Sequence, residues 1–233
     1  VDLNECQDIA RQLFENHPGK DFNVIMGGGM SRLVVDDENG KRKDGKNLTE
    51  NWMNLHPQGK FVKTRDELLR VNSNTDHLLG IFAKSHMQFN VDRNSSIEPS
   101  LAEMTVAALK VLKNKNSRGF LLMVEGAKID LAHHYNNAFR ALDETLALDE
   151  AIKAALANIG KILKFNGFLV FKIQLILDLT ETLVVVTADH ASSMVYSGFA
   201  TPKNYSVLGF DKYVSNIDGK AYQLLTYASG IGY

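Results

Sequence analysis

The chain has 233 residues, of which 45% are hydrophobic and 23% are charged, and its formal net charge is -1. This composition is that of a folded globular protein, and it excludes the disordered and fibrous classes. The balance of 26 basic and 27 acidic residues gives no positive field of the kind that nucleic-acid binding needs, so we expect no nucleic-acid partner. A single cysteine, Cys6, excludes an internal disulfide framework and a cysteine-built zinc site.

The N-terminal part of the chain predicts the start of an α/β domain. Residues 5–17 have helical periodicity, Pro18-Gly19 predicts a turn, and FNVIMGGG (22–29) predicts a buried strand that runs into glycines. These glycines match neither the dinucleotide-binding nor the P-loop spacing, so they indicate a tight turn. Residues 32–88 are polar, with turn signals and short apolar segments.

The middle of the chain predicts helices that alternate with buried strands. A helix begins near Pro99, and GFLLMVEG (119–126) is an apolar run too short for an ordinary helix, which predicts a buried strand. The next helix extends from about Ala132, and TLVVVTADH (182–190) predicts a second buried strand. We expect a core-facing stripe on that helix, formed by Phe139, Leu142, Leu146, Ala147 and Ile152.

Both predicted strands end in a carboxylate and an imidazole. Glu125 ends the first strand, and Asp130 and His134 follow at a spacing that puts them on one face if the turn is helical. Asp189 and His190 end the second strand. Ligands bind outside the carboxyl ends of strands in open α/β sheets, so we expect the two strand ends to face one crevice. Because Asp and His bind zinc, and carboxylates with water bind magnesium, these residues predict a metal site.

Each pair taken alone has a simpler interpretation. An aspartate at a helix start, such as Asp130, is a common N-cap, and an Asp-His couple is often a surface hydrogen bond. We expect His133 to pack or to be solvated. The residues to which we assign no metal role are Cys6, His17, His56, His77 and His86.

Several segments resemble, in the right order, motifs of the animal alkaline phosphatases. They are CQDIA, VIMGGGM, DGKNL, SLAEMTVAALKVL, MVEGAKIDLAHH, VVVTADHAS and GFATP, and together they cover nearly the whole chain. The resemblance implies that residues 1–233 form a partial alkaline phosphatase domain. Its fold would be α/β, with a central mixed, largely parallel sheet flanked by helices on both faces.

The resemblance also implies a function and a ligand set. The full-length enzyme would hydrolyse phosphate monoesters through a phosphoserine intermediate at a site with two Zn²⁺ ions and one Mg²⁺ ion. Glu125 would match the magnesium ligand, Asp130 and His134 two ligands of the first zinc, and Asp189 and His190 two ligands of the second. The enzyme would be a homodimer, secreted or held by a lipid anchor at the extracellular face of the plasma membrane.

The family's nucleophilic serine and phosphate-binding arginine would precede Val1, and the last histidine ligand of the first zinc would follow Tyr233. Each zinc would then keep two protein ligands, whereas catalytic zinc usually has three. We therefore expect the isolated chain to be inactive. Two other interpretations stay open: a catalytically inactive metal- or phosphate-binding relative, and another metal-dependent hydrolase of the same core, such as a sulfatase or phosphodiesterase.

GKILKFNGFLVFKIQLIL (160–177) has no counterpart in this resemblance. Its removal would join the preceding helix to the next strand by the short connection that α/β units prefer. The segment consists largely of Lys, Ile, Leu, Phe and Asn, which AT-rich noncoding DNA would encode, so we expect a translated intron. The alternative is a genuine extra strand or hairpin. Three lysines interrupt the run and make it a poor membrane span.

Signals of secretion are limited in this sequence. Residues 1–5 are acidic and do not have the features of a signal peptide, so we expect neither a signal peptide nor an anchor within the chain. Three glycosylation sequons permit a glycosylated, secreted protein. They are Asn47-Leu48-Thr49, Asn94-Ser95-Ser96 and Asn204-Tyr205-Ser206.

Overall fold

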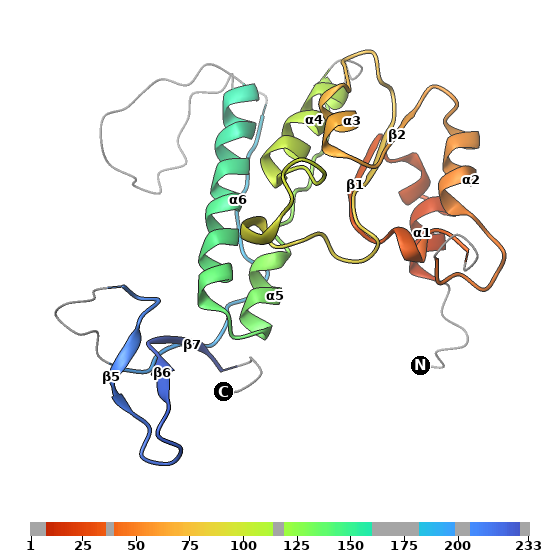
Figure 1. The fold of residues 1–233 in the computed structure, drawn as a ribbon. Helices are drawn as coiled ribbons and strands as arrows, with labels where there is room; N and C mark the ends of the chain where they lie inside the picture. The colour runs from red at the N-terminus through yellow and green to blue at the C-terminus, as the bar shows by residue number, and fades with distance from the viewer. Residues whose placement is uncertain (1–7, 36–39, 114–118, 160–181, 199–205, 229–233) are drawn as a thin grey trace. The chain divides into compact units, whose positions relative to one another are not determined.

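The computed structural model describes residues 8–35, 40–113, 119–159, 182–198 and 206–228 (Figure 1). The chain forms two compact units, which are described separately. The sheet unit comprises Val1–Gln88, Asp92–Val124 and Ala151–Asn158. The hairpin unit comprises Phe89–Val91, Glu125–Glu150 and Ile159–Tyr233.

The sheet unit is built on a three-stranded parallel sheet with the strand order β1-β3-β2. Its strands are β1 (Val24–Gly27), β2 (Lys60–Val62) and β3 (Leu78–Ile81). Its helices are α1 (Ile9–Glu15), α2 (Leu48–Leu55), α3 (Arg65–Leu69) and α4 (Leu101–Lys113). Short 3₁₀ turns occur at Gly19–Asp21, Met30–Arg32 and Asn90–Asp92.

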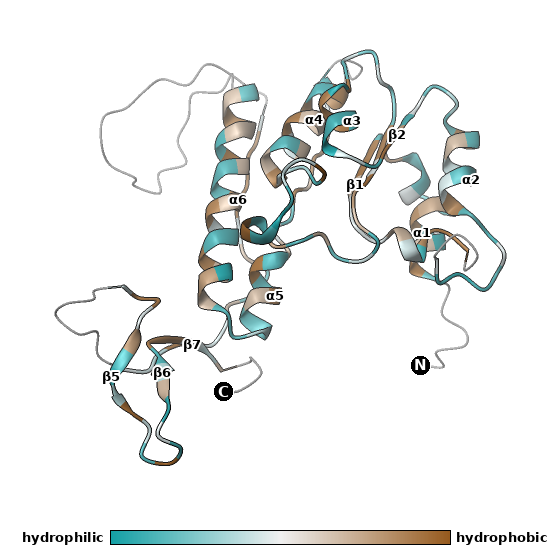
Figure 2. Cartoon of the chain, in the orientation of Figure 1, coloured by the Kyte–Doolittle hydropathy of each residue, from teal (hydrophilic) through white to brown (hydrophobic). Residues whose placement is uncertain are grey.

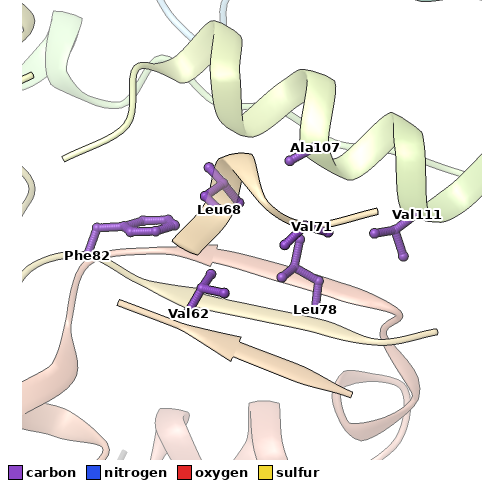
Figure 3. Close-up of a cluster of buried hydrophobic side chains, with 7 residues drawn as sticks. All are labelled: Val62, Leu68, Val71, Leu78, Phe82, Ala107 and Val111. Atoms are coloured by element: carbon purple, nitrogen blue, oxygen red, sulfur yellow. The ribbon is translucent and has the colours of Figure 1, made fainter. Parts of the chain in front are cut away.

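Side chains of the sheet alternate between two hydrophobic cores, as the period of an extended strand requires. Val62 and Leu78 enter one core with Leu68, Val71 and other residues of the α3 and α4 side, and Figure 3 shows these side chains directed toward one another. Leu79 and Ile81 enter the opposite core, which is closed by Phe14, Leu48 and Trp52 from the α1 and α2 side. Figure 2 shows β1 and β2 as predominantly hydrophobic. The expected parallel sheet with helices on both faces is therefore confirmed.

Local hydrogen bonds explain where the helices of this unit begin. The Asn47 carboxamide oxygen accepts the N–H groups of Thr49 and Glu50 at the start of α2. Thr64 and Glu67 form a reciprocal capping box before α3. Each cap satisfies amide groups that have no partner inside the helix.

The start of α4 combines a capping box with an ion pair. The Ser100 N–H donates to Glu103 Oε2 at 2.9 Å, and the Glu103 N–H donates to Ser100 Oγ at 3.1 Å. The same carboxylate accepts from Arg65 Nη2 at 2.6 Å, which connects α3 to α4. Burial raises the pKa of Glu103, but the hydrogen bonds from Arg65 and Ser100 and the charge of Arg65 outweigh it, and the net pKa is lowered.

The sequence predictions for this unit are partly confirmed. The strand expected within residues 22–29 is β1, and the helix expected near Pro99 is α4. The helix expected over 5–17 is observed at Ile9–Glu15, and residues 5–7, with Cys6, lie outside the described residues. The stretch 32–88, interpreted only as polar with short apolar segments, contains α2, β2, α3 and β3.

The two buried strands predicted at 119–126 and 182–190 are not strands in the structure, and this prediction is wrong. Neither segment pairs with another strand among the described residues. Leu121 is 93% exposed and Leu183 is 87% exposed. An extended apolar segment becomes a buried strand only when a neighbouring strand and a covering layer accept it, and neither segment has such a partner in the described part of the chain.

The hairpin unit combines two helices with two antiparallel strand pairs. Its helices are α5 (Lys128–His134) and α6 (Ala138–Ile159), of which Ala151–Asn158 are assigned to the sheet unit. Its strand pairs are β4 (Met194–Tyr196) with β7 (Leu225–Tyr227) and β5 (Phe210–Val214) with β6 (Ala221–Gln223). Its core contains Phe89, Ala132, Ala138, Ala141, Leu225 and Tyr227.

The hydrophobic stripe predicted for α6 is mostly on the wrong side of the helix. Ala147 is buried as expected, but Phe139 is 53% exposed and Leu146 is 62% exposed. The core-facing positions are instead Ala138 and Ala141. The small alanine side chains allow close approach of Leu225 and Tyr227, which larger residues at these positions would prevent.

Asn136 fixes the end of α5 against β7. Its φ of 49° lies in the left-handed region, which asparagine tolerates better than most residues. Its Oδ1 accepts the Tyr227 N–H at 2.7 Å, and the ring centroids of His133 and Tyr227 lie 4.2 Å apart with the rings tilted by 31°. One asparagine therefore turns the chain after α5 and satisfies an amide of the adjacent strand.

None of the helices in the described ranges combines the length and the apolar character needed to cross a bilayer. The suspected insertion at 160–177 lies outside the described residues, as does residue 204 of the third sequon.

We predict that the Glu103 carboxylate stabilises the sheet unit in a pH-dependent way. E103A removes both the cap and the ion pair and should cost about 1–2 kcal/mol, whereas E103Q keeps a capping oxygen and should cost about half as much. The folded pKa of Glu103 lies below its unfolded value, so this stabilisation is complete above the unfolded value of about 4.3 and is lost as the pH falls through the folded pKa. The free energy of unfolding of each variant is measured by urea unfolding, followed by the fluorescence of Trp52. E150Q, at an exposed α6 position, is the matched control, and an E103Q free energy of unfolding equal to that of E150Q at neutral pH would contradict the assignment.

A second prediction concerns Asn136. N136D keeps an acceptor oxygen and tolerates the left-handed backbone, N136G keeps only the backbone freedom, and N136A keeps neither. We expect amide exchange in the peptide containing Tyr227 to be about tenfold faster in N136A than in N136D, with N136G between them, because about 1–2 kcal/mol of local stability is lost. Hydrogen–deuterium exchange with mass spectrometry measures this, and equal rates in N136A and N136D would show that the contact is dispensable.

Candidate metal centre

The helix α5 brings together the first pair of predicted ligands. Asp130 and His134 lie one turn apart, and Asp130 Oδ2 is 3.3 Å from His134 Nε2. The residue at the N-cap position is Ala127, which provides no side-chain cap. The interpretation of Asp130 as an N-cap is therefore wrong, and its carboxylate is directed to an imidazole. The predicted helical turn between the two residues is confirmed.

The second pair comes from a segment far away in the sequence, yet it lies beside Asp130. His190 Nε2 is 3.9 Å from Asp130 Oδ1 and 3.3 Å from Asp189 Oδ2. Although no regular strand precedes them, His190 lies beside the α5 carboxylate and Asp189 lies beside His190. Asp130 is thus placed between two imidazoles, one on each of its oxygens.

The four side chains form a row of contacts. Within the described ranges, no three histidine, cysteine or carboxylate side chains converge as they would around a bound ion. All four are accessible to solvent, from 46% exposure at Asp130 to 88% at Asp189. Glu125, the predicted magnesium ligand, is exposed just before α5, and no hydrogen bond or ion pair joins it to the four in the described part of the chain.

The hydrogen bonding of His190 suits a metal ligand. Its Nδ1 lies 3.0 Å from the Ala191 carbonyl oxygen, which can only accept, so Nδ1 is the donor. This leaves Nε2 directed toward Asp130 and Asp189. Metal-binding histidines commonly donate their second ring nitrogen to a carbonyl or carboxylate in this way. The hydrogen bond to Ala191 and the charge of Asp189 raise the pKa of His190.

His133 has a different environment from its neighbour. It packs against Tyr227 and is partly buried, and this burial lowers its pKa although the Asp130 charge opposes the change. His134, one residue later, is 58% exposed on the side of Asp130. Of the two environments expected for His133, packed or solvated, the structure has the packed one, and the two adjacent histidines therefore have different surroundings.

The supporting residues Asn136 and Tyr227 were not predicted from the sequence. An asparagine just after a helix is a known signal for a left-handed C-terminal residue, so the Asn136 backbone was within reach of sequence reasoning. Tyr227 had no local signal, because it meets α5 only through the tertiary fold.

Two carboxylates and two imidazoles are a donor set that fits zinc. With both imidazoles neutral the row carries a charge of about -2, and a divalent cation neutralises it. The chemistry of these four donors is therefore compatible with a divalent cation.

Comparisons with known proteins identify the family of this chain. The whole chain, residues 1–233, matches the family model described as alkaline phosphatase. A membrane-bound alkaline phosphatase of Bombyx mori is 40% identical over 99% of this chain and 40% of its own length. The human tissue-nonspecific alkaline phosphatase is 35% identical over 98% of this chain and 42% of its own length.

The crystal structure of Thermus thermophilus alkaline phosphatase has a TM-score of 0.54 and 35% identity, over 65% of this chain and 30% of that one. The chain thus spans less than half the length of these relatives, and its α/β fold matches part of theirs. A match that extends over all 233 residues places the chain in the alkaline phosphatase family.

Proposed function

We propose that the full-length protein hydrolyses phosphate monoesters at a two-zinc, one-magnesium site to which this chain contributes five ligands. Asp130 and His134 bind the first zinc, Asp189 and His190 bind the second, and Glu125 binds magnesium. The observation that carries the proposal is the position of the Asp130 carboxylate, within 3.3 Å of His134 and 3.9 Å of His190.

In this proposal, the residues of this chain bind the metal ions and orient their ligand atoms. Bound zinc and magnesium supply Lewis-acid stabilisation of phosphoryl oxygens and lower the pKa of a nucleophilic hydroxyl or water. Asp130 and His134, fixed one turn apart on α5, set the orientation of their ligand atoms. The Ala191 carbonyl holds Nδ1 of His190 so that Nε2 is available. Tyr227 and Asn136 keep α5 in place behind them.

Residues 1–233 alone bind metal without turning over substrate. The chain corresponds to about 40% of the length of the Bombyx relative. We assign the serine that forms the phosphoserine intermediate and the arginine that binds phosphate to the part of the full-length protein that this chain does not cover. Each zinc has only two ligands here, fewer than the three that catalytic zinc usually takes from protein.

The assembled enzyme is a homodimer that is secreted or lipid-anchored, and it is glycosylated. One relative carries the description membrane-bound, which supports attachment of this protein to a membrane. The three sequons are consistent with passage through the secretory route.

The metal site is tested by zinc binding to the purified chain. We expect D130N and H134Q to weaken zinc binding at least tenfold, measured by competition with a chromophoric chelator, because second-shell and ligand changes commonly cost about 10- to 100-fold. D66N on α3 and H86Q, both at exposed positions in the sheet unit, are matched controls and should bind as the unmodified chain does. If D130N and H86Q bound zinc equally, Asp130 would not be a ligand.

The activity is tested separately with p-nitrophenyl phosphate and excess zinc and magnesium. We expect no turnover by residues 1–233, and zinc-dependent turnover by a version extended with the regions that its relatives have and this chain does not. Zinc-dependent hydrolysis by the unextended chain would refute the first part. Metal binding without hydrolysis in the extended protein would instead favour the inactive binding relative, and a preference for sulfate esters or phosphodiesters would favour the other hydrolases.

A further inference from the structure

The two glycosylation sequons in the described part of the chain differ in their exposure to solvent. A sequon can be used when the asparagine carboxamide nitrogen and the hydroxyl two residues later are both accessible. The described residues include the sequons that begin at Asn47 and Asn94, whereas the one at 204 lies outside them. The two described sequons have opposite environments.

The Asn47 sequon is part of the helix start that supports the sheet unit. Its Oδ1 accepts the Thr49 N–H at 3.1 Å, the Glu50 N–H at 3.2 Å and the Thr49 hydroxyl at 2.8 Å. Thr49 is only 4% exposed, and Leu48 between them is fully buried in the core. The hydroxyl that a transferase must recognise is therefore inside the fold.

The Asn94 sequon is on the surface, in the loop that precedes α4. Asn94, Ser95 and Ser96 are all exposed. Asn94 Oδ1 accepts the Ser96 N–H at 3.0 Å, and the Asn94 carbonyl accepts from Ile97 and Glu98 at 2.9 Å each. In the described part of the chain, Asn94 Nδ2 and the Ser96 hydroxyl form no hydrogen bond with protein groups, so both are available.

A bulky group at Asn94 would not disturb the packing beneath it. The base of the loop is held by Arg93 Nη1, which donates to the Glu98 carbonyl at 2.9 Å, and by the Gln88 N–H, which donates to Glu98 Oε2 at 3.0 Å. Pro99 beyond it is fully buried. The loop also has an exposed apolar residue, Ile97, at 51% exposure, which an attached sugar can cover.

We propose that Asn94 is an N-glycan acceptor of this protein and that Asn47 is unmodified in the folded chain. The donor is an oligosaccharide linked to a polyprenyl pyrophosphate. The carboxamide nitrogen Nδ2 of Asn94 forms a bond to the anomeric carbon, the bond from that carbon to the pyrophosphate oxygen breaks, and the polyprenyl pyrophosphate leaves with the electron pair. The proton from Nδ2 passes to a base of the transferase. The inference concerns a surface loop and does not depend on the proposed phosphatase activity.

The test uses the 233-residue chain expressed behind a cleavable secretory signal in cultured mammalian cells. N204Q is included as a background substitution, so that the sequon outside the described residues contributes nothing. Glycan occupancy is measured at each asparagine by mass spectrometry after peptide N-glycosidase F, in both cell-associated and secreted chain. We expect one glycan, at Asn94, with complete loss in N94Q and no change in N47Q.

Matched serine variants decide whether the loss is specific. S96A removes the sequon hydroxyl and should abolish the glycan, whereas S95A, the same change one residue earlier, should leave it in place, and S96T should restore it. An unmodified Asn94 in the cell-associated and secreted chain would overturn the proposal. A glycan at Asn47 in secreted chain that unfolds in urea at the same midpoint as the chain without that glycan would also overturn it. Neither readout requires turnover, so failure of the proposed phosphatase function leaves this test intact.

Discussion

The sheet unit depends on strand β3 being paired on both edges and covered on both faces. Leu78 and Leu79 are adjacent, both are fully buried, and they enter different cores. Because side chains alternate along a strand, a shift of one residue would exchange these two cores. Burial of each leucine contributes roughly 1.5–3 kcal/mol, so the register of a four-residue strand is strongly specified. The positions of β1, β2 and their covering helices follow from it.

The candidate site depends on how the short helix α5 is packed in the hairpin unit. The helix α5 has only seven residues, too short to be stable by itself in water, and its N-terminal end has no side-chain cap. Its position is therefore determined by the buried Ala132, the ring contact between His133 and Tyr227 and the hydrogen bond between Asn136 and Tyr227. Asp130 and His134 project from the side of the helix that these contacts leave open. The placement of these two side chains is a consequence of packing at the opposite side of the helix.

Sequence reasoning succeeded where the controlling interactions are local. The apolar run that ends in glycines predicted β1, the Pro99-Ser100 segment predicted α4, and the four-residue spacing predicted that Asp130 and His134 share a face.

Sequence-based prediction failed where a partner distant in the sequence determines the structure of a segment. The runs at 119–126 and 182–190 have strand-like composition but no strand to pair with in the described residues. Strand β3 was not predicted because it is short and lies in a polar region, and its central place in the sheet comes from its pairing with β1 and β2. Tyr227 was not predicted because it meets α5 only through the tertiary fold. The proximity of His190 to Asp130 was predicted from the rule for strand ends, although the strands themselves are not observed.

The exposed apolar residues at 119–124 and 182–186 have a consequence for the behaviour of the chain in solution. Leu121, Met123, Leu183 and Val185 are each more than 70% exposed, on backbone that has no ladder partner among the described residues. Such segments can pair with copies of themselves on other molecules, and that association depends on concentration. Self-association of this chain therefore depends on its concentration as well as on the stability of its folded cores. A dilute sample and a concentrated sample are expected to differ in their state of assembly.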